Sequence, residues 1–246
     1  MDKEKMTISE EKQVFHMWEP MHFEVGHGYN YRRDSLIWRF VTSVFQNIAS
    51  AALLVIDGVW FGMKIKGRKH LKAVRHTGAV TISNHIHPMD CTMIDVALWG
   101  RKRYFVSLES NFRIPVARHL IRILGAVPMS SKSALVIEMF SEMEKALQNK
   151  ALVHIFPEGV MVPYANGIRP FKNGAFRLAY KAGVPVLPIA VTQHEPSGLW
   201  RLFRKKPCLH VEILPPVFLD DEAVEKKTAG GLREACRKVY EDVFDR

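Results

Sequence analysis

From residue 78 onward, short runs of apolar residues alternate with longer stretches whose apolar positions recur at helical spacing. We expect strands over residues 79–83, 103–107, 125–129, 152–156 and 185–191. We expect helices over residues 89–99, 115–124, 132–148 and 174–182. Alternation of this kind predicts an α/β fold with a mixed, largely parallel sheet flanked by helices.

The last part of the chain adds one strand and one helix to this pattern. A strand is expected over residues 208–216, where the sequence reads CLHVEILPP. Apolar residues then recur at helical spacing, at Leu232, Ala235, Cys236, Val239, Tyr240 and Val243. Such a stripe indicates a C-terminal helix with one side packed on the core.

The segment Ser35–Met63 lacks proline, is rich in apolar residues and predicts a helix or a pair of helices. Its least interrupted part, Phe40–Ile56, has 17 residues, which gives roughly 26 Å of helix against about 30 Å of hydrocarbon core. Gln46 and Asn47 interrupt this part, and Asp57 follows it. We therefore expect a helix that lies in one leaflet of a membrane. The alternative is an amphipathic helix packed on the domain's own core.

These patterns divide the chain into two parts. Residues 1–63 comprise an irregular arm, rich in aromatic residues, followed by the apolar, membrane-associated helix. Residues 64–246 form the α/β domain. The first residues lack the apolar core of a signal peptide, and three widely spaced cysteines fit a reducing compartment without a disulfide framework.

The net positive charge of the chain favours anionic binding partners. The 246 residues are 48% apolar and 24% charged, and 35 Lys and Arg exceed 25 Asp and Glu to give +10. Such an excess favours anionic lipid, phosphorylated substrates or nucleic acid. Basic clusters at 64–76, 101–103 and 201–206 lie near apolar segments, and no nucleic-acid recognition motif accompanies them. We therefore expect contacts to lipid headgroups or an anionic substrate, and no nucleic acid.

The sequence TISNHIHPMDC, residues 81–91, holds the candidate chemistry. Pro88 suits the first turn of a helix, which makes Asp90 the third helical residue and leaves His85 in the preceding loop. From there the carboxylate of Asp90 can reach one ring nitrogen of His85, which is the arrangement of a general base. His87 is interpreted as a structural loop residue.

Two other interpretations of this stretch remain open. His85 and His87 resemble the start of a metal-dependent hydrolase motif, with His154 or His194 as further candidate ligands. The stretch is also compatible with a polar turn that has no chemistry, as in a membrane-binding module with a decayed site.

Several motifs together resemble those of the glycerolipid O-acyltransferases, the family of 1-acyl-sn-glycerol-3-phosphate and lysophospholipid acyltransferases. Asn84-His85 and Asp90 match the first motif, NHxxxxD, and FPEG at 156–159 matches the third. The segments 113–127, 170–179 and 184–191 match the approach to the second motif, the continuation of the third, and the fourth. The resemblance covers about residues 60–215 and makes 64–246 an acyltransferase domain.

The resemblance implies an acyltransferase of phospholipid biosynthesis that works at the cytoplasmic face of a membrane as a peripheral or monotopic protein. The acyl group would pass from acyl-CoA or acyl-carrier protein to a lysophospholipid, 1-acyl-sn-glycerol-3-phosphate, to give phosphatidate, without cofactor or metal. His85 and Asp90 would be catalytic. The implied substrate-binding residues are Asn84, Gly125, Lys132, Phe156, Pro157, Glu158, Gly159 and Lys172.

The chain departs from the family at basic positions that the resemblance assigns to the acceptor's phosphate. Ser131 stands where the second motif has an arginine, residues 107–112 lack a lysine, and Val160 and Met161 replace Thr-Arg after the third motif. A different lysolipid acceptor is therefore the alternative. The candidate substitutes for these basic residues are Arg113, Arg122, Lys132, Arg169 and Lys172.

Overall fold

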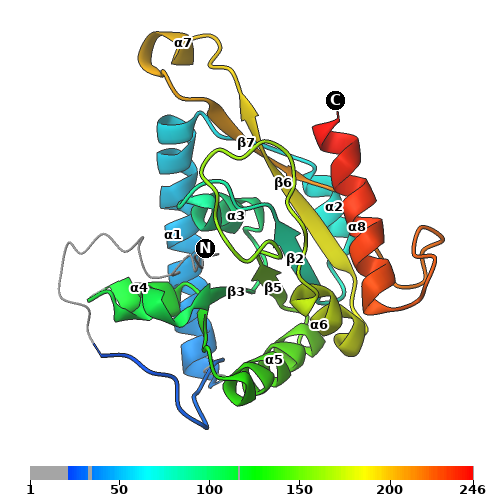
Figure 1. Cartoon of the computed structure of the whole chain (residues 1–246). Helices are drawn as coiled ribbons and strands as arrows, with labels where there is room; N and C mark the ends of the chain where they lie inside the picture. The colour runs from blue at the N-terminus through cyan, green and yellow to red at the C-terminus, as the bar shows by residue number, and fades with distance from the viewer. Residues whose placement is uncertain (1–21, 33–34, 116, 246) are drawn as a thin grey trace, which may run out of the picture.

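The computed structural model describes residues 22–32, 35–115 and 117–245, and within them a seven-stranded sheet forms the centre (Figure 1). The strands are β1 (Lys64–Lys66), β2 (Ala79–Ser83), β3 (Arg103–Leu108), β4 (Ala126–Met129), β5 (Leu152–Ile155), β6 (Val186–His194) and β7 (Cys208–Ile213). Their order is β1-β7-β6-β2-β5-β3-β4, and every neighbouring pair is parallel except β6 with β7. The expected α/β fold with a mixed, largely parallel sheet is confirmed.

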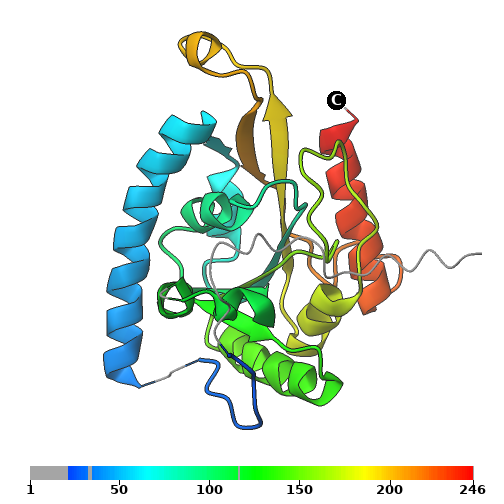
Figure 2. The same cartoon turned by 60° about the vertical axis from the view of Figure 1, so that its left-hand side comes forward.

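Helices cover both faces of the sheet (Figures 1 and 2). On one face lie α1 (Leu36–Phe61), α2 (Arg68–Ala73) and α3 (Asp90–Ala97), and on the other α5 (Ser133–Gln148), α6 (Gly174–Ala182) and α8 (Ala229–Phe244). The remaining helical pieces are η1 (Glu109–Arg113), α4 (Ala117–Ile123) and α7 (Trp200–Phe203). Two apolar cores result, one between each helical layer and the sheet.

The central strand β2 is buried on both faces, which explains the short apolar run that predicted it. All five of its residues are buried, as expected for a parallel strand covered on both faces. Pro188 of β6 lies opposite Ile82 and cannot donate a backbone hydrogen bond. The hydroxyl of Tyr240 fills this interruption, 2.9 Å from the Ile82 carbonyl oxygen and 3.2 Å from the Ile189 nitrogen. One side chain thereby joins α8 to two central strands.

Most predicted elements lie within a few residues of the observed ones, and the differences have local causes. The helix after β2 begins at Asp90, and Pro88 lies in the preceding turn, so its predicted place as the first helical residue is wrong. Strand β7 ends at Ile213 because Pro215 and Pro216 cannot extend a ladder. The short elements β1, α2 and α7 were not predicted.

The arm predicted for residues 1–33 is described only over residues 22–32, which contain no helix or strand; its first 21 residues lie outside the described part of the chain. The described piece packs on the domain. The nitrogen of Val25 donates to Glu109 at 2.6 Å, and Arg32 pairs with Glu142 of α5 at 3.0 Å.

Helix α1 has a polar inner face and an apolar outer face. The side that faces the domain buries four polar residues, Thr42, Gln46, Ser50 and Asp57, together with Phe61. The outer side exposes large apolar residues, namely Leu36, Ile37, Phe40, Val44, Phe45, Ile48, Val55, Ile56, Val59 and Trp60. In length and composition α1 could cross a membrane. As in the alternative interpretation, α1 packs on the domain. An ordinary amphipathic helix, however, turns its apolar face to the domain and its polar face outward, whereas α1 does the reverse.

A buried ion pair fixes the polar face of α1. Arg103 is 1% exposed, and its guanidinium donates to both carboxylate oxygens of Asp95, at 2.6 and 2.8 Å. Ser50 of α1 donates to the same carboxylate at 2.7 Å, and Gln46 donates to the Arg103 carbonyl oxygen at 3.2 Å. Arg101 binds three backbone carbonyl oxygens. Neither of the two interpretations open for residues 101–103, a cluster for anionic ligands or a solvated loop, describes these two arginines, because both bind protein oxygens.

We predict that Asp95→Asn lowers the free energy of unfolding by about 3–5 kcal/mol, because it leaves the Arg103 charge buried without its counter-ion. Urea unfolding at neutral pH followed by circular dichroism measures the change. Glu225→Gln is the matched control, since its pair with Lys238 is exposed on both sides and such pairs contribute little. Equal stability of the two variants would contradict the structural importance of the buried pair.

Candidate functional site

The parallel pairing of β2 with β5 brings together two loops that are about 70 residues apart in the sequence. Ile82 pairs with Ile155, so the loop that starts at Asn84 and the loop that starts at Phe156 leave the same edge of the sheet side by side. The carboxyl edge of a parallel sheet is where α/β proteins usually bind ligands. The two best sequence motifs therefore meet at one place.

The carboxylate of Asp90 organises the first loop. It is fully buried, and its Oδ2 atom lies 2.9 Å from Nδ1 of His85. The same oxygen accepts from the backbone nitrogens of Ile86 at 2.7 Å and His87 at 2.9 Å. Asp90 is also the first residue of α3, where the helix dipole favours a negative charge. These bonds leave the second ring nitrogen of His85 for a ligand, and 23% of this side chain is exposed.

The second loop supports His85 from two sides. The ring of Phe156 stacks on the imidazole, with centroids 4.0 Å apart and an angle of 19° between the planes. Glu158 accepts from the backbone nitrogen of His85 at 3.1 Å and from that of Arg169 at 3.0 Å. The guanidinium of Arg169 also binds Glu158 and the carbonyl oxygens of His85 and Val160. Glu158 thus positions the loop and is charge-compensated.

Three other expected site residues lie in the same region. The side-chain amide of Asn84 is buried and bonds the nitrogen and carbonyl oxygen of Val191, each at 2.8 Å, so it ties the loop to β6 and does not face an open pocket. Pro157 accepts from the nitrogen of Lys172 at 2.8 Å. Gly159 has φ +73°, and a β-carbon there would lie 2.6 Å from the Lys172 ammonium. The Lys172 side chain could move aside, so it is the positive φ that favours glycine at this position.

The structure does not bring Gly125 and Lys132 to His85. Gly125 precedes β4, at the opposite edge of the sheet, and has φ +97°; a β-carbon there would lie 2.5 Å from the Arg103 carbonyl oxygen and 2.7 Å from the Gln46 side chain. Its small size allows the close approach of β3 and α1. Lys132 follows β4 at the same edge as His85 but lines a separate hollow, where its ammonium pairs with Glu24.

The histidines proposed for a metal site do not converge. Among the described residues, no group of three or more His, Cys, Asp or Glu could hold a metal ion. His154 is buried between Thr81 and Ser83, whose hydroxyl oxygens lie 3.0 and 3.3 Å from its two ring nitrogens. His194 stacks on His210 with 3.9 Å between ring centroids. The residues present do not fit the metal-site alternative.

The geometry permits proton transfer at a neutral imidazole whose orientation is fixed by a carboxylate. Sequence reasoning found this pair from the NHxxxxD spacing. It named Arg169 as one of five candidate phosphate-binding residues, whereas in the structure Arg169 holds Glu158. It also missed the stacking of Phe156 on His85; an aromatic residue at the end of the neighbouring strand was the available signal.

Comparisons with known proteins give relatives of this chain at the level of sequence. A family model described as Acyltransferase matches residues 63–192. The 1-acyl-sn-glycerol-3-phosphate acyltransferase of Escherichia coli (strain K12) is 28% identical over 187 residues, which cover 74% of this chain and 73% of the relative. The enzyme of that name from Limnanthes douglasii is 27% identical over 189 residues, or 75% of this chain and 64% of the relative.

A solved structure supports the fold. The crystal structure of the 1-acyl-sn-glycerophosphate acyltransferase PlsC from Thermotoga maritima superposes with a TM-score of 0.58. The sequence identity is 21%, and the match covers 85% of this chain and 82% of that chain.

The buried His154 predicts a pH dependence of stability. Burial, with a smaller effect of the His85 charge, lowers the pKa of His154 to about 3 from an ordinary 6.5. Between these values the unfolded chain binds a proton that the folded chain does not. Stability is therefore full above pH 6.5 and falls as the pH decreases toward 3, by about 2 kcal/mol at pH 5.

The measurement is urea unfolding of the wild-type protein and His154→Gln at pH 7 and pH 5. The loss of stability over this interval should be about 2 kcal/mol smaller in the variant, while contributions of all other groups are shared. Equal losses of stability in both proteins would mean that His154 binds a proton as readily in the folded chain as in the unfolded chain between pH 7 and pH 5, and would contradict the prediction.

Proposed function

Because this chain belongs to the acyltransferase family, we propose that it moves a fatty acyl group from a thioester donor to the free hydroxyl of a lysophospholipid. The observation that carries the proposal is the pair of His85 and Asp90, joined at 2.9 Å at the carboxyl edge of the sheet. Its exposed imidazole can take a proton from an incoming hydroxyl group. The family implies an acyl donor and a lipid acceptor.

In the proposed reaction the free ring nitrogen of His85 removes the proton from the acceptor hydroxyl as its oxygen attacks the thioester carbonyl carbon. The C–O bond forms, the C–S bond breaks, and the proton passes from the imidazolium to the departing thiolate. Asp90 stabilises the charged ring during transfer. The acceptor itself is the nucleophile, so the reaction needs no acyl-enzyme, cofactor or metal.

The proposed acceptor is 1-acyl-sn-glycerol-3-phosphate, which would give phosphatidate. The names of the relatives from Escherichia coli and Limnanthes douglasii support this choice. Another lysophospholipid is the alternative, because the chain lacks basic residues at the second- and third-motif positions noted above. The donor is acyl-CoA or acyl-carrier protein.

A membrane surface is the proposed place of action. The apolar outer face of α1 supports this proposal, because exposed apolar side chains of such number indicate a lipid or protein contact. We propose peripheral or monotopic attachment at the cytoplasmic face, with α1 lying in one leaflet. Leu199, Leu202 and Phe203, in or next to α7 in the β6–β7 connection, are also exposed. Helix α7 lies near the C-terminal end of α1 (Figure 1).

We predict that His85→Ala lowers kcat at least about 100-fold while leaving the fold intact, because a general base typically contributes about 10²–10⁴ in rate. Asp90→Asn should also be severely impaired. The assay combines one labelled acyl donor with a panel of lysophospholipids, analysed by mass spectrometry. The matched control is His27→Ala, whose side chain is 80% exposed and lies outside the basic segment 64–76.

Two outcomes would contradict the proposal. Failure of the wild-type protein to acylate any lysophospholipid in the panel would remove the function itself. An equal loss of activity in His85→Ala and His87→Ala would argue for a shared role of the two rings and revive the metal alternative; His87→Ala is expected to retain kcat within about tenfold of wild type.

We predict that Phe40→Ser, Ile48→Ser and Val55→Ser combined weaken binding to anionic vesicles at least tenfold, because each apolar side chain contributes about 1.5–3 kcal/mol when buried. Vesicle sedimentation measures the binding. The control is Ile137→Ser, a 70% exposed residue on α5, on the other face of the sheet.

Raising salt from 0.1 to 1 M should weaken wild-type binding, since the Debye length falls from about 10 to 3 Å. Equal binding by the triple variant and the control would overturn the role of α1.

A further inference from the structure

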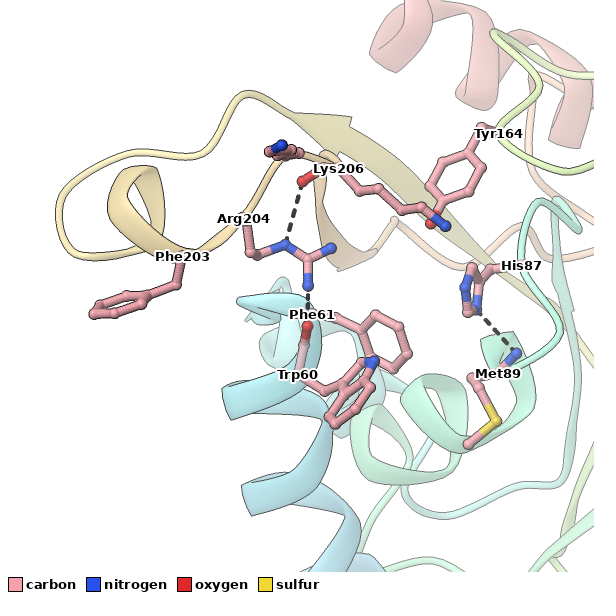
Figure 3. A pocket seen from close by; sticks show the side chains of 9 residues that line it. Trp60, Phe61, His87, Met89, Tyr164, Phe203, Arg204 and Lys206 are labelled. Carbon is pink, nitrogen blue, oxygen red and sulfur yellow. Dashed lines mark hydrogen bonds between the residues drawn. The ribbon is translucent and has the colours of Figure 1, made fainter.

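A hollow of about 340 Å³ lies beside the loop that carries His85 (Figure 3). Its walls come from Trp60 and Phe61 at the end of α1, from His87 and Met89 after β2, and from Tyr164. Residues 203–206, which lead into β7, complete it. We call this hollow, with these residues, the hairpin pocket. His87 belongs to the loop that presents His85, so the hairpin pocket lies beside this loop, although His85 itself does not line it.

The charge of the hairpin pocket is positive without compensation. Arg204, Lys205 and Lys206 line it, and no carboxylate does so among the residues that the structure describes. The hollow at the other end of the carboxyl edge is different, because Glu24 and Glu109 accompany its arginine and lysine. Of these two hollows, only the hairpin pocket offers a net excess of cations for an anionic group.

The three cations have different tasks. The guanidinium of Arg204 donates to the carbonyl oxygens of Trp60, Lys206 and Pro207, so it fastens the segment to the end of α1. Its hydrogen bonds to protein oxygens make Arg204 a positioning residue. Lys206 lies 5.8 Å from the centroid of the Tyr164 ring. Both lysines are exposed and have no carboxylate partner in the described part of the chain, so their ammonium groups can contact a ligand.

His87 adds a neutral donor to the pocket. Burial lowers the pKa of His87, and the nearby charges of Lys206 and Arg204 lower it further against the opposing effect of Asp90. Its Nδ1 atom accepts from the nitrogen of Met89 at 3.1 Å. The proton of the neutral ring is therefore on Nε2, which can donate to an oxygen. Two ammonium groups and one imidazole N–H are suitable partners for a phosphate.

Apolar groups beside these cations indicate what carries the phosphate. Trp60 and Phe203 line the pocket and are 71% and 79% exposed. Trp60 ends the apolar outer face of α1, so the pocket opens beside the surface proposed to contact lipid. A ligand that combines a phosphate with an apolar chain satisfies both parts of the wall.

We propose that the hairpin pocket binds the phosphate group of a substrate through Lys205 and Lys206, an inference that rests on the proposed acyl transfer. A lysolipid acceptor and a CoA or carrier-protein donor both carry a phosphate. The position beside the lipid-facing end of α1 favours the acceptor. Bound there, its headgroup would be held next to the loop that presents His85.

The test compares Lys205→Ala combined with Lys206→Ala against Lys226→Ala combined with Lys227→Ala. The control pair removes the same charge from an exposed segment before α8. Calorimetry measures binding of three probes without turnover: 1-acyl-glycerol-3-phosphate, monoacylglycerol and CoA. We expect the first double variant to bind the phosphate-bearing lysolipid at least tenfold more weakly. The control variant should match wild type, and monoacylglycerol should bind all three proteins alike.

The binding results distinguish the phosphate of the acceptor from that of the donor. Weaker binding of the lysolipid phosphate alone assigns the pocket to the acceptor, and weaker binding of CoA alone assigns it to the donor. Unchanged binding of both, or an equal loss in the control variant, overturns the pocket. Because binding is measured without a donor–acceptor pair, a wild-type protein that transfers no acyl group would refute the proposed function without deciding this test. If that function holds, the variant should raise KM for the affected substrate and retain kcat.

Discussion

The parallel register between β2 and β5 is the constraint on which the rest of the site depends. In a parallel pair, the loops that follow both strands leave the same edge of the sheet. The loops that begin at Asn84 and Phe156 are therefore neighbours in space, although they are far apart in the sequence. Asp90 then closes the first loop and Glu158 joins it to the second. A shift of this register by one residue would exchange the faces of every side chain in the strand. The imidazole of His85 would then lose both supports.

Much of this could be predicted because it depends on local order in the chain. Strand and helix positions follow from apolar periodicity, and the distance from His85 to Asp90 places a turn between them. The tasks of Asn84 and Arg169 could not be predicted, because their partners lie on strands and loops far away in the sequence. The close approach of the Arg103 carbonyl oxygen and Gln46 to Gly125 could not be predicted for the same reason.

The composition gives the net positive charge, but it does not show which basic side chains bind the protein itself and which stay exposed. Arg101 and Arg103 belong to a conspicuous basic cluster, yet the fold turns both inward to bind carbonyl and carboxylate oxygens. Lys205 and Lys206 belong to another such cluster and stay exposed. The two clusters cannot be distinguished by residue type, because a buried partner such as Asp95 decides the direction of the side chain. Net charge therefore overstates what is available to an anionic ligand.

The reversed polarity of α1 has a consequence for the order of events in biosynthesis. A helix that crosses a bilayer must find partners for its polar groups inside the membrane. In α1 the domain binds most of the polar row, through Gln46, Ser50 and one carboxylate oxygen of Asp57. These contacts form without lipid, so the proposed attachment of α1 to a membrane surface would follow the folding of the domain. Until then the chain carries an uncovered apolar strip, which makes the interval between synthesis and arrival the period of greatest exposure to aggregation.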